Sequence, residues 1–299
     1  MSREIKKLAV VGTGNLGARI ALQAAYYGYQ VSTWDPNPAS FDHSMAMSEQ
    51  RLKLTERTPC LTWTQLGEAA QKVARSATLE QALEGVDMVI EAIPENLELK
   101  REMYARLDQL APAGAILATN SSSIPVSLIA DATGRPELCV NIHFYTLDIG
   151  RNLVDVMGSS EAPTELIEQC AEWVRSIGCV PLTVHKQIHG FCFNRIWRAI
   201  KKESLHMWAG DYVDFKDIDR GWMIWSGMDE GPFALMDGVG LDVVYDIEMS
   251  YFIESGDAKD RPPEALREKV ARGELGTKTG QGFYTYPDPE FKKADFLKK

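Results

Sequence analysis

The chain has 299 residues, of which 45% are hydrophobic and 25% are charged, and its formal net charge is −10. This length allows two domains with a sizeable core, and the composition is that of a globular protein rather than a disordered one. The acidic balance argues against general binding to nucleic acid, which needs a basic face.

The sequence carries no sign of secretion or of membrane insertion. The N-terminal MSREIKKL runs almost directly into an apolar segment and leaves no room for a signal peptide. No apolar run approaches the roughly 20 residues that a membrane helix needs. The five cysteines, without CxxC spacing, favour reduced thiols over disulfides or a metal site. We therefore expect a soluble cytoplasmic protein without a bound metal.

The N-terminal stretch has the layout of a dinucleotide-binding βαβ unit. An apolar run, Leu8–Val11, enters the glycine turn GTGNLG at residues 12–17, a helical segment follows, and a second apolar run ends on Asp35. An acid at this point can accept hydrogen bonds from a ribose diol and would repel a 2′-phosphate. No arginine follows it immediately, so the sequence predicts NAD rather than NADP as the cofactor.

Each part of the turn has a physical role in holding a pyrophosphate. Gly12 permits the tight turn from strand to helix, Gly14 lets the backbone approach the phosphates, and Gly17 lets the helix pack close to the sheet. The helix N-terminus, at Asn15 and Leu16, supplies free N–H groups and a partial positive charge. We expect these five residues to bind the cofactor together with the acid that ends the second strand.

Short apolar runs separated by helical segments predict a doubly wound, mostly parallel sheet covered on both faces. Further strands are expected at residues 86–93, 115–119, 139–144, 152–157 and 180–184. Helices between them are expected at residues 97–110 and 161–177. The segment 36–74 is too long for an ordinary connection, and its spacing predicts an inserted helical arm with helices over 41–57 and 61–73.

Helical periodicity replaces the strand signals from Phe191 onward. Long helices are expected at residues 193–208 and 262–272, with others opening at Gly231 and at Gly240. Asp214 or Asp217 is placed to cap a further helix. The sequence therefore predicts an α/β Rossmann domain over residues 1–185 and an all-α domain over residues 186–299.

Polar residues follow three of the predicted strands, at the sheet edge where ligands of doubly wound folds bind. These groups are residues 91–96 with Lys100, residues 120–123, and His143. The serine run in the second group could equally cap a helix that starts near Pro125.

His143 is the sharpest candidate for a general base, because a histidine side chain exchanges protons near neutral pH. Asp155, twelve residues later on the next predicted strand, could fix its tautomer and stabilise the imidazolium. The alternative is a satisfied core histidine.

Seven motifs follow one another along the chain: GTGNLG with Asp35, EAIPENLELK, ATNSSS, NIHF, GFCFNR, GMDEGPFALMDGVGLD and GTKTGQGFYTY. In this order and with this spacing they resemble the L-3-hydroxyacyl-CoA dehydrogenase family, over nearly the whole chain. The resemblance implies NAD-dependent oxidation of the 3-hydroxyl of an (S)-3-hydroxyacyl-CoA, or the reverse reduction, on short acyl chains. Because the helical domain forms the dimer interface in this family, a homodimer is also implied.

The resemblance also assigns roles to single residues. It implies that His143 is the base, with Asp155 as its carboxylate partner, and that Ser122 hydrogen-bonds the substrate oxygen. Asn194, from the helical domain, would complete the catalytic site. On the cofactor side the matching residues are Ala92, Glu95, Lys100 and Asn120.

The chain departs from the family pattern in two places. The family commonly has HFFNP where this chain has HFYTL, so Thr146 replaces an asparagine expected near the nicotinamide. The partner of the base is usually Glu, and Asp155 is shorter by one methylene. An Asp can orient a His only if the strands lie closer or a water bridges the gap.

The acyl carrier is the open point. Arg51, Lys53 and Arg57 could meet the phosphates of CoA, or they could form an ordinary solvated helix face. Relatives of similar architecture oxidise free 3-hydroxy acids such as L-gulonate or carnitine. A further alternative is a non-catalytic NAD-binding protein like the lens crystallins related to this family.

Overall fold

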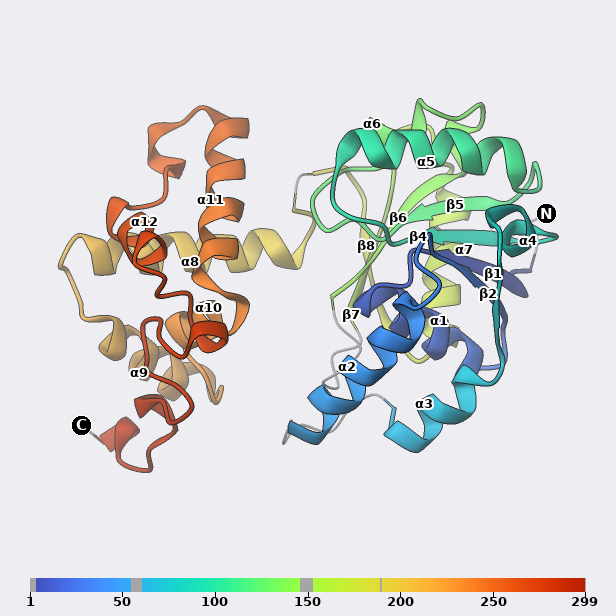
Figure 1. Cartoon of the computed structure of the whole chain (residues 1–299). Helices are drawn as coiled ribbons and strands as arrows, with labels where there is room; N and C mark the ends of the chain where they lie inside the picture. The colour runs from blue at the N-terminus through green and yellow to red at the C-terminus, as the bar shows by residue number, and fades with distance from the viewer. Residues whose placement is uncertain (1–3, 55–60, 146–152, 189, 299) are drawn as a thin grey trace. The chain divides into compact units, whose positions relative to one another are not determined.

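The computed structural model describes residues 4–54, 61–145, 153–188 and 190–298, without the side chains of residues 50–54. The chain forms two compact units, residues 1–192 and 193–299, and each is described by itself (Figure 1).

The first unit is built on one eight-stranded sheet, in the order β3-β2-β1-β4-β5-β6-β7-β8. Its strands are β1 (Lys7–Val11), β2 (Gln30–Trp34), β3 (Val73–Arg75), β4 (Met88–Glu91), β5 (Ile116–Thr119), β6 (Cys139–Phe144), β7 (Leu153–Gly158) and β8 (Val180–Val184). Neighbouring strands are parallel except β6 and β7, which are antiparallel. The strand order reverses between β1 and β4, which is the switch point where such sheets bind ligands. The predicted mostly parallel sheet is confirmed.

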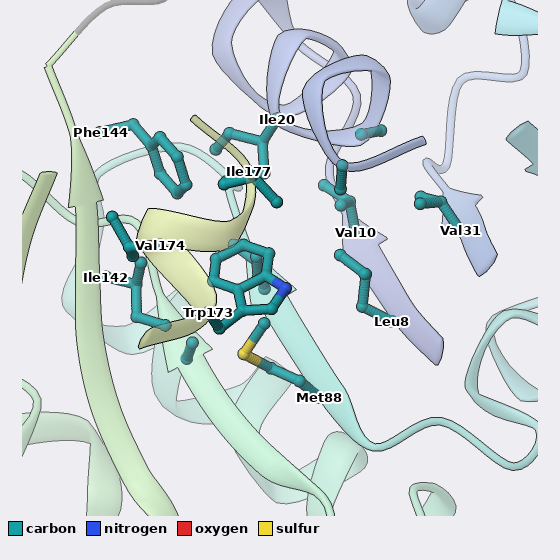
Figure 2. Close-up of a cluster of buried hydrophobic side chains, with 14 of the residues drawn as sticks. Leu8, Val10, Ile20, Val31, Met88, Ile142, Phe144, Trp173, Val174 and Ile177 are labelled. Atoms are coloured by element: carbon teal, nitrogen blue, oxygen red, sulfur yellow. The ribbon is translucent and has the colours of Figure 1, made fainter. Parts of the chain in front are cut away.

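Helices cover both faces of this sheet. One face packs against α1 (Asn15–Tyr26), α2 (Ser40–Leu54), α3 (Trp63–Ala70) and α7 (Thr164–Ser176), and the other against α4 (Leu79–Leu83), α5 (Leu97–Leu110) and α6 (Ser127–Ala130). Each face of the sheet has its own hydrophobic core. Because side chains alternate along β1, Leu8 and Val10 belong to the first core, on the α1 side, and Ala9 and Val11 belong to the second, on the α5 side. Figure 2 shows the ring of Trp173, from α7, among apolar side chains of the first core.

The sequence prediction was wrong at the end of the helical arm. The helix expected over residues 61–73 ends at Ala70, and Val73 begins strand β3. This edge strand has three residues, too few for an alternating pattern to show in the sequence. Helix α4 was missed for the same reason, since five residues make little more than one turn.

The second unit is all-helical, as predicted. Its helices are α8 (Phe193–Ala209), α9 (Phe215–Ser226), α10 (Pro232–Val239), α11 (Leu241–Ser255) and α12 (Glu264–Ala271). Asp214 is the N-cap of α9, where its side chain accepts the N–H of Lys216. In the part of the chain that the structure describes, no helix is long and apolar enough to cross a membrane.

Two buried aspartates organise the core of the second unit. Asp219 accepts the N–H groups of Phe233 and Ala234, at 2.8 and 3.0 Å, and the hydroxyl of Tyr284 at 2.9 Å. Asp237 accepts the N–H groups of Phe283 and Tyr284, at 2.9 and 2.8 Å. The two carboxylates thus tie the start of α10 and the C-terminal segment to the helices.

Candidate active site

The glycine turn leaves open space at the start of α1. Gly12 has φ +92°, and a Cβ there would lie 2.7 Å from the carbonyl oxygen of Ala92. A Cβ on Gly17 would lie 2.1 Å from the carbonyl oxygen of Gly12, so both positions need glycine. A Cβ on Gly14, by contrast, would meet nothing within 4 Å. The free space lies beside the N–H groups of Asn15 and the residues after it, which fits a pyrophosphate.

Asp35 is held in a fixed orientation at the end of β2. Its Oδ2 accepts the N–H of Thr13 at 2.7 Å, and its Oδ1 accepts the N–H of Asn37 at 2.9 Å. The carboxylate lines a pocket of about 270 Å³ that also contains Phe41 and Arg75. Carboxylate oxygens at this point suit the hydroxyls of a ribose, so the pocket fits the adenosine half of NAD.

Arg75 is a pocket residue that the sequence analysis missed. It comes from β3, and its guanidinium donates to Asp42 at 2.8 Å and lies 4.6 Å from the ring centroid of Phe41. Asp42 offsets part of the positive charge that Arg75 brings to the pocket, and the preference of the Asp35 pocket for NAD over NADP stays a prediction. A correct prediction of β3 would have found it, since parallel strands end at the same sheet edge.

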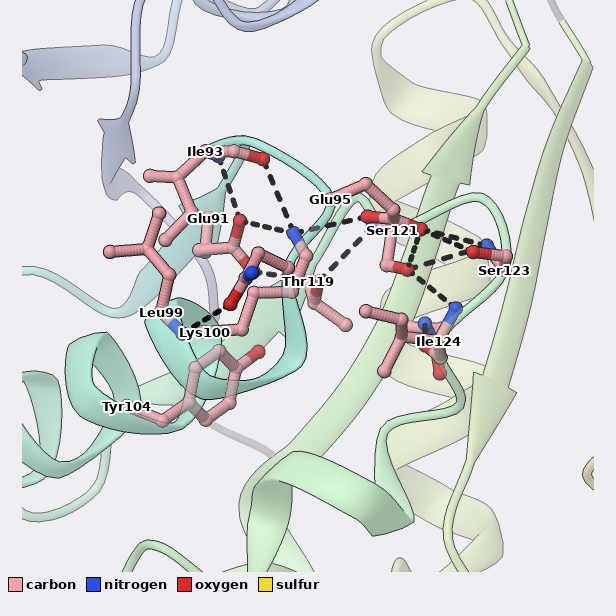
Figure 3. A network of polar contacts seen from close by, with 12 residues as sticks. Glu91, Ile93, Glu95, Leu99, Lys100, Tyr104, Thr119, Ser121, Ser123 and Ile124 are labelled. Carbon is pink, nitrogen blue, oxygen red and sulfur yellow. Dashed lines mark hydrogen bonds and ion pairs between the residues drawn. The ribbon is translucent and has the colours of Figure 1, made fainter. Parts of the chain in front are cut away.

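A buried ion pair lies under the loop that follows β4 (Figure 3). Lys100 Nζ is 2.7 Å from Glu91 Oε1, and these side chains are 1% and 0% exposed. Glu91 also accepts the N–H of Ile93 and the hydroxyl of Thr119, each at 2.8 Å. Lys100 is therefore a buried part of this network, 3.4 Å from Glu95.

Glu95 organises the serine run after β5. Its Oε1 accepts the hydroxyl of Ser121 at 2.5 Å, and the N–H and hydroxyl of Ser123 at 3.0 and 2.7 Å. Burial raises the pKa of Glu95, but these bonds and Lys100 outweigh it and leave the pKa below its usual value. Ser122 lies between the two bound serines and is exposed.

The serines do not cap the next helix, so that alternative was wrong. The N-cap of α6 is Val126, which makes no side-chain capping bond. Two asparagines instead tie the serine run to β6. Asn141 Oδ1 accepts the N–H of Val126 at 2.7 Å, and Asn120 Oδ1 accepts the N–H of Phe144 at 2.9 Å. The run is thereby fixed beside the strand that carries His143.

His143 and Asp155 are direct partners across the antiparallel strands β6 and β7. His143 Nδ1 lies 3.5 Å from Asp155 Oδ2, and the two residues are 4% and 0% exposed. The antiparallel register places the two residues opposite each other, which brings Nδ1 and Oδ2 to the outer limit of hydrogen-bonding distance. The role of Asp155 in place of the usual Glu stays a prediction.

Two aromatic residues that the sequence analysis did not single out surround this pair. The hydroxyl of Tyr145 donates to Asp155 Oδ2 at 2.5 Å. The ring of Phe191 lies 5.5 Å from that of His143, and Phe191 has φ 53°, which is uncommon for a residue other than glycine. The one sequence signal for Tyr145 was its place in HFYTL, where the family pattern has Phe.

Several predicted site residues are not tested by this geometry. Asn194 lies at the start of α8 in the second unit, so its role beside His143 stays a prediction. Thr146 and Arg57 lie outside the described residues, as do the side chains of Arg51 and Lys53.

Two family models together match almost the whole chain. The model described as "3-hydroxyacyl-CoA dehydrogenase, NAD binding domain" matches residues 7–188, and "3-hydroxyacyl-CoA dehydrogenase, C-terminal domain" matches residues 190–286. The chain belongs to the 3-hydroxyacyl-CoA dehydrogenase family. It is an NAD-dependent oxidoreductase of this type, and the predicted family and cofactor are confirmed.

Relatives of the chain differ in the activities for which they are named. A probable 3-hydroxybutyryl-CoA dehydrogenase of Bacillus subtilis is 32% identical over 95% of this chain and 99% of the relative. The crystal structure of an (S)-3-hydroxybutyryl-CoA dehydrogenase from Ralstonia eutropha has a TM-score of 0.84 and 30% identity, and covers 95% of this chain and 100% of that one. A 5-formyl-3-hydroxy-2-methylpyridine 4-carboxylate 5-dehydrogenase of Mesorhizobium japonicum is 28% identical over 97% of this chain and 93% of the relative.

Proposed function

We propose that the protein interconverts a short-chain (S)-3-hydroxyacyl-CoA, such as 3-hydroxybutyryl-CoA, and the corresponding 3-ketoacyl-CoA. The observation that carries the proposal is the buried His143–Asp155 pair at the end of β6, beside the serine run and the glycine turn's sheet edge. A histidine held by a carboxylate next to a dinucleotide site is the group that alcohol oxidation requires.

The residues of the chain divide the proton chemistry between them. Because Nδ1 of His143 faces Asp155, Nε2 is the nitrogen left to take the proton of the 3-hydroxyl. The negative charge of Asp155 offsets the imidazolium that forms, and the exposed hydroxyl of Ser122 donates to the substrate oxygen. Asn194 completes this site in the proposal. NAD, when bound, accepts the hydride from the substrate carbon.

On the cofactor side, we assign the pyrophosphate to the glycine turn and the ribose to Asp35. The turn residues are Gly12, Gly14, Asn15, Leu16 and Gly17. Ala92, Glu95 and Asn120 line the nicotinamide side, and Lys100 acts from its buried position by holding Glu95. The order of β1, β4, β5 and β6 in the sheet supports this assignment, because these groups all follow adjacent strands.

The substrate's carrier is tested by comparing two substrates with NADH. Turnover of acetoacetyl-CoA, followed at 340 nm, is the expected result. Turnover of acetoacetate or another free 3-keto acid alone would favour the alternative, a dehydrogenase of a non-CoA 3-hydroxy acid. The Mesorhizobium relative is named for a pyridine carboxylate substrate, which supports this alternative. Thermal stabilisation by NADH with no turnover of either would instead support a non-catalytic NAD-binding protein.

We further propose a homodimer formed through the helical unit. Helix α11 exposes Val243, Ile247 and Ile253, at 40%, 38% and 75%, and a partner subunit packed on this helix would cover these apolar side chains. Size-exclusion chromatography with light scattering would give a mass of two chains, and a single-chain mass at micromolar concentration would contradict the dimer.

A further inference from the structure

One oxygen of Asp155 is shared by two donors. Oδ2 accepts the hydroxyl of Tyr145 at 2.5 Å and lies 3.5 Å from Nδ1 of His143. The other oxygen, Oδ1, is buried and has no hydrogen-bond partner among the described residues. The tyrosine and the histidine therefore share one acceptor oxygen.

Strand geometry brings the three side chains together. Tyr145 continues β6, since its N–H donates to the carbonyl oxygen of Leu153 at 3.3 Å, and it lies two residues beyond His143. The side chains of Tyr145 and His143 therefore lie on the same face of the sheet, and their rings meet edge-on with centroids 4.5 Å apart. Asp155 is opposite His143 and diagonal to Tyr145.

The two contacts with Asp155 differ in strength. A phenol donating to a carboxylate at 2.5 Å is a strong charge-assisted hydrogen bond, whereas an N···O distance of 3.5 Å is longer than an ordinary one. The hydrogen bond from Tyr145 offsets part of the negative charge on Asp155. The carboxylate therefore stabilises a positive charge on the imidazole ring less strongly.

We propose that Tyr145 is a positioning residue for the base, which holds the carboxylate of Asp155 and thereby weakens its bond to His143. Through Asp155, Tyr145 sets the pH at which His143 can accept a proton. The inference rests on the role proposed above for His143. Among the described residues, the titratable side chains shown against the His143 ring are Tyr145, directly after β6, and Asp155 on β7, while β8 places the uncharged Leu182 beside Asp155.

The test is Tyr145→Phe, which removes the hydroxyl and keeps the ring. Freed from the tyrosine, Asp155 should bond His143 more closely and favour the imidazolium. In the oxidation of 3-hydroxybutyryl-CoA by NAD, the acidic limb of the kcat/KM profile should therefore move to higher pH by about one unit. The midpoint of the His143 side-chain NMR titration should move in the same direction. This signal is identified by its loss in His143→Gln, and it needs no substrate.

Two further variants test the route and the specificity of the effect. In an Asp155→Asn background, Tyr145→Phe should move neither the limb nor the midpoint, because the carboxylate through which it acts is absent. Tyr29→Phe is the matched control, since it removes a hydroxyl that lies 2.5 Å from Ser176 Oγ and not from His143 or Asp155. It should leave both readouts unchanged.

An unshifted NMR midpoint in Tyr145→Phe would overturn the inference, and so would an equal shift in the Asp155→Asn background. The proposed function fails separately: if His143→Gln keeps its kcat, His143 is not the base. The NMR titration still decides the coupling of Tyr145 to His143 in that case.

Discussion

Lys100 and Glu91 form an ion pair 2.7 Å long in which neither side chain is more than 1% exposed. Removing one partner leaves a buried charge without its counter-ion. We therefore expect Lys100→Met to lower the free energy of unfolding by about 3 to 5 kcal/mol, measured by urea denaturation. The double variant Lys100→Met with Glu91→Gln should recover part of this loss.

The control for this prediction is an exposed pair of similar length. Lys216 Nζ lies 2.6 Å from Glu290, and these side chains are 38% and 50% exposed. Lys216→Met should cost about 1 kcal/mol or less, because water already screens the two charges. Equal losses in the two single variants would show that the burial of Lys100 carries no special cost.

His143→Ala tests the base directly. The variant should lose about 10³-fold in kcat, because a positioned general base typically contributes 10²- to 10⁴-fold. The Kd for NAD should stay within about twofold, since the ring lies beyond the glycine turn and the Asp35 pocket. Steady-state kinetics and NADH fluorescence titration measure the two quantities. A parallel loss in both would count against the assigned role.

Asp35→Ala tests the ribose assignment. The variant should bind NAD more weakly by about tenfold, the effect of losing about 1.4 kcal/mol of hydrogen bonding. Its preference for NAD over NADP should also fall, because the charge that repels a 2′-phosphate is gone. Asp131→Ala is the control, since this exposed acid pairs with Arg101 and its loss changes the net charge equally. An unchanged NAD:NADP ratio in Asp35→Ala would contradict the assignment.

Asp219 makes the stability of the helical unit depend on pH. Burial raises its pKa from 3.8 to about 7, even though two backbone N–H groups and Tyr284 donate to it. Between those two values the folded chain holds a proton that the unfolded chain has released. The contribution of Asp219 to the free energy of unfolding is therefore complete below pH 3.8 and is lost as the pH rises to about 7.

Thermal unfolding at pH 5, 6, 7 and 8 checks this prediction. As the pH rises, the Tm of the wild type should fall more than the Tm of Asp219→Asn, because the asparagine side chain does not ionise in this range. Asp131→Asn, an exposed acid in the first unit, should follow the wild-type profile. The prediction fails if the Asp219→Asn and wild-type curves run parallel.

The sequence by itself determined the fold class, the cofactor and the family. It could do so because these depend on local patterns. The turn at residues 12–17 needs glycine at Gly12 for its positive φ and at Gly17 for close packing, and both requirements appear as residue identities. The end of β2, directly before Asp35, follows from an apolar run that stops at an acid. Helix α5 and strands β6 and β8 were predicted at their observed bounds for the same reason.

Only the tertiary structure decided how distant residues combine. Arg75 lines the pocket of Asp35 because β3 pairs with β2. A strand of three residues is too short for its sequence pattern to predict this pairing. The antiparallel register of β6 and β7 puts Asp155 opposite His143 and diagonal to Tyr145. A register shift by one residue would turn Asp155 to the other face of the sheet, so the shared carboxylate depends on pairing between strands and not on the order of residues within either one.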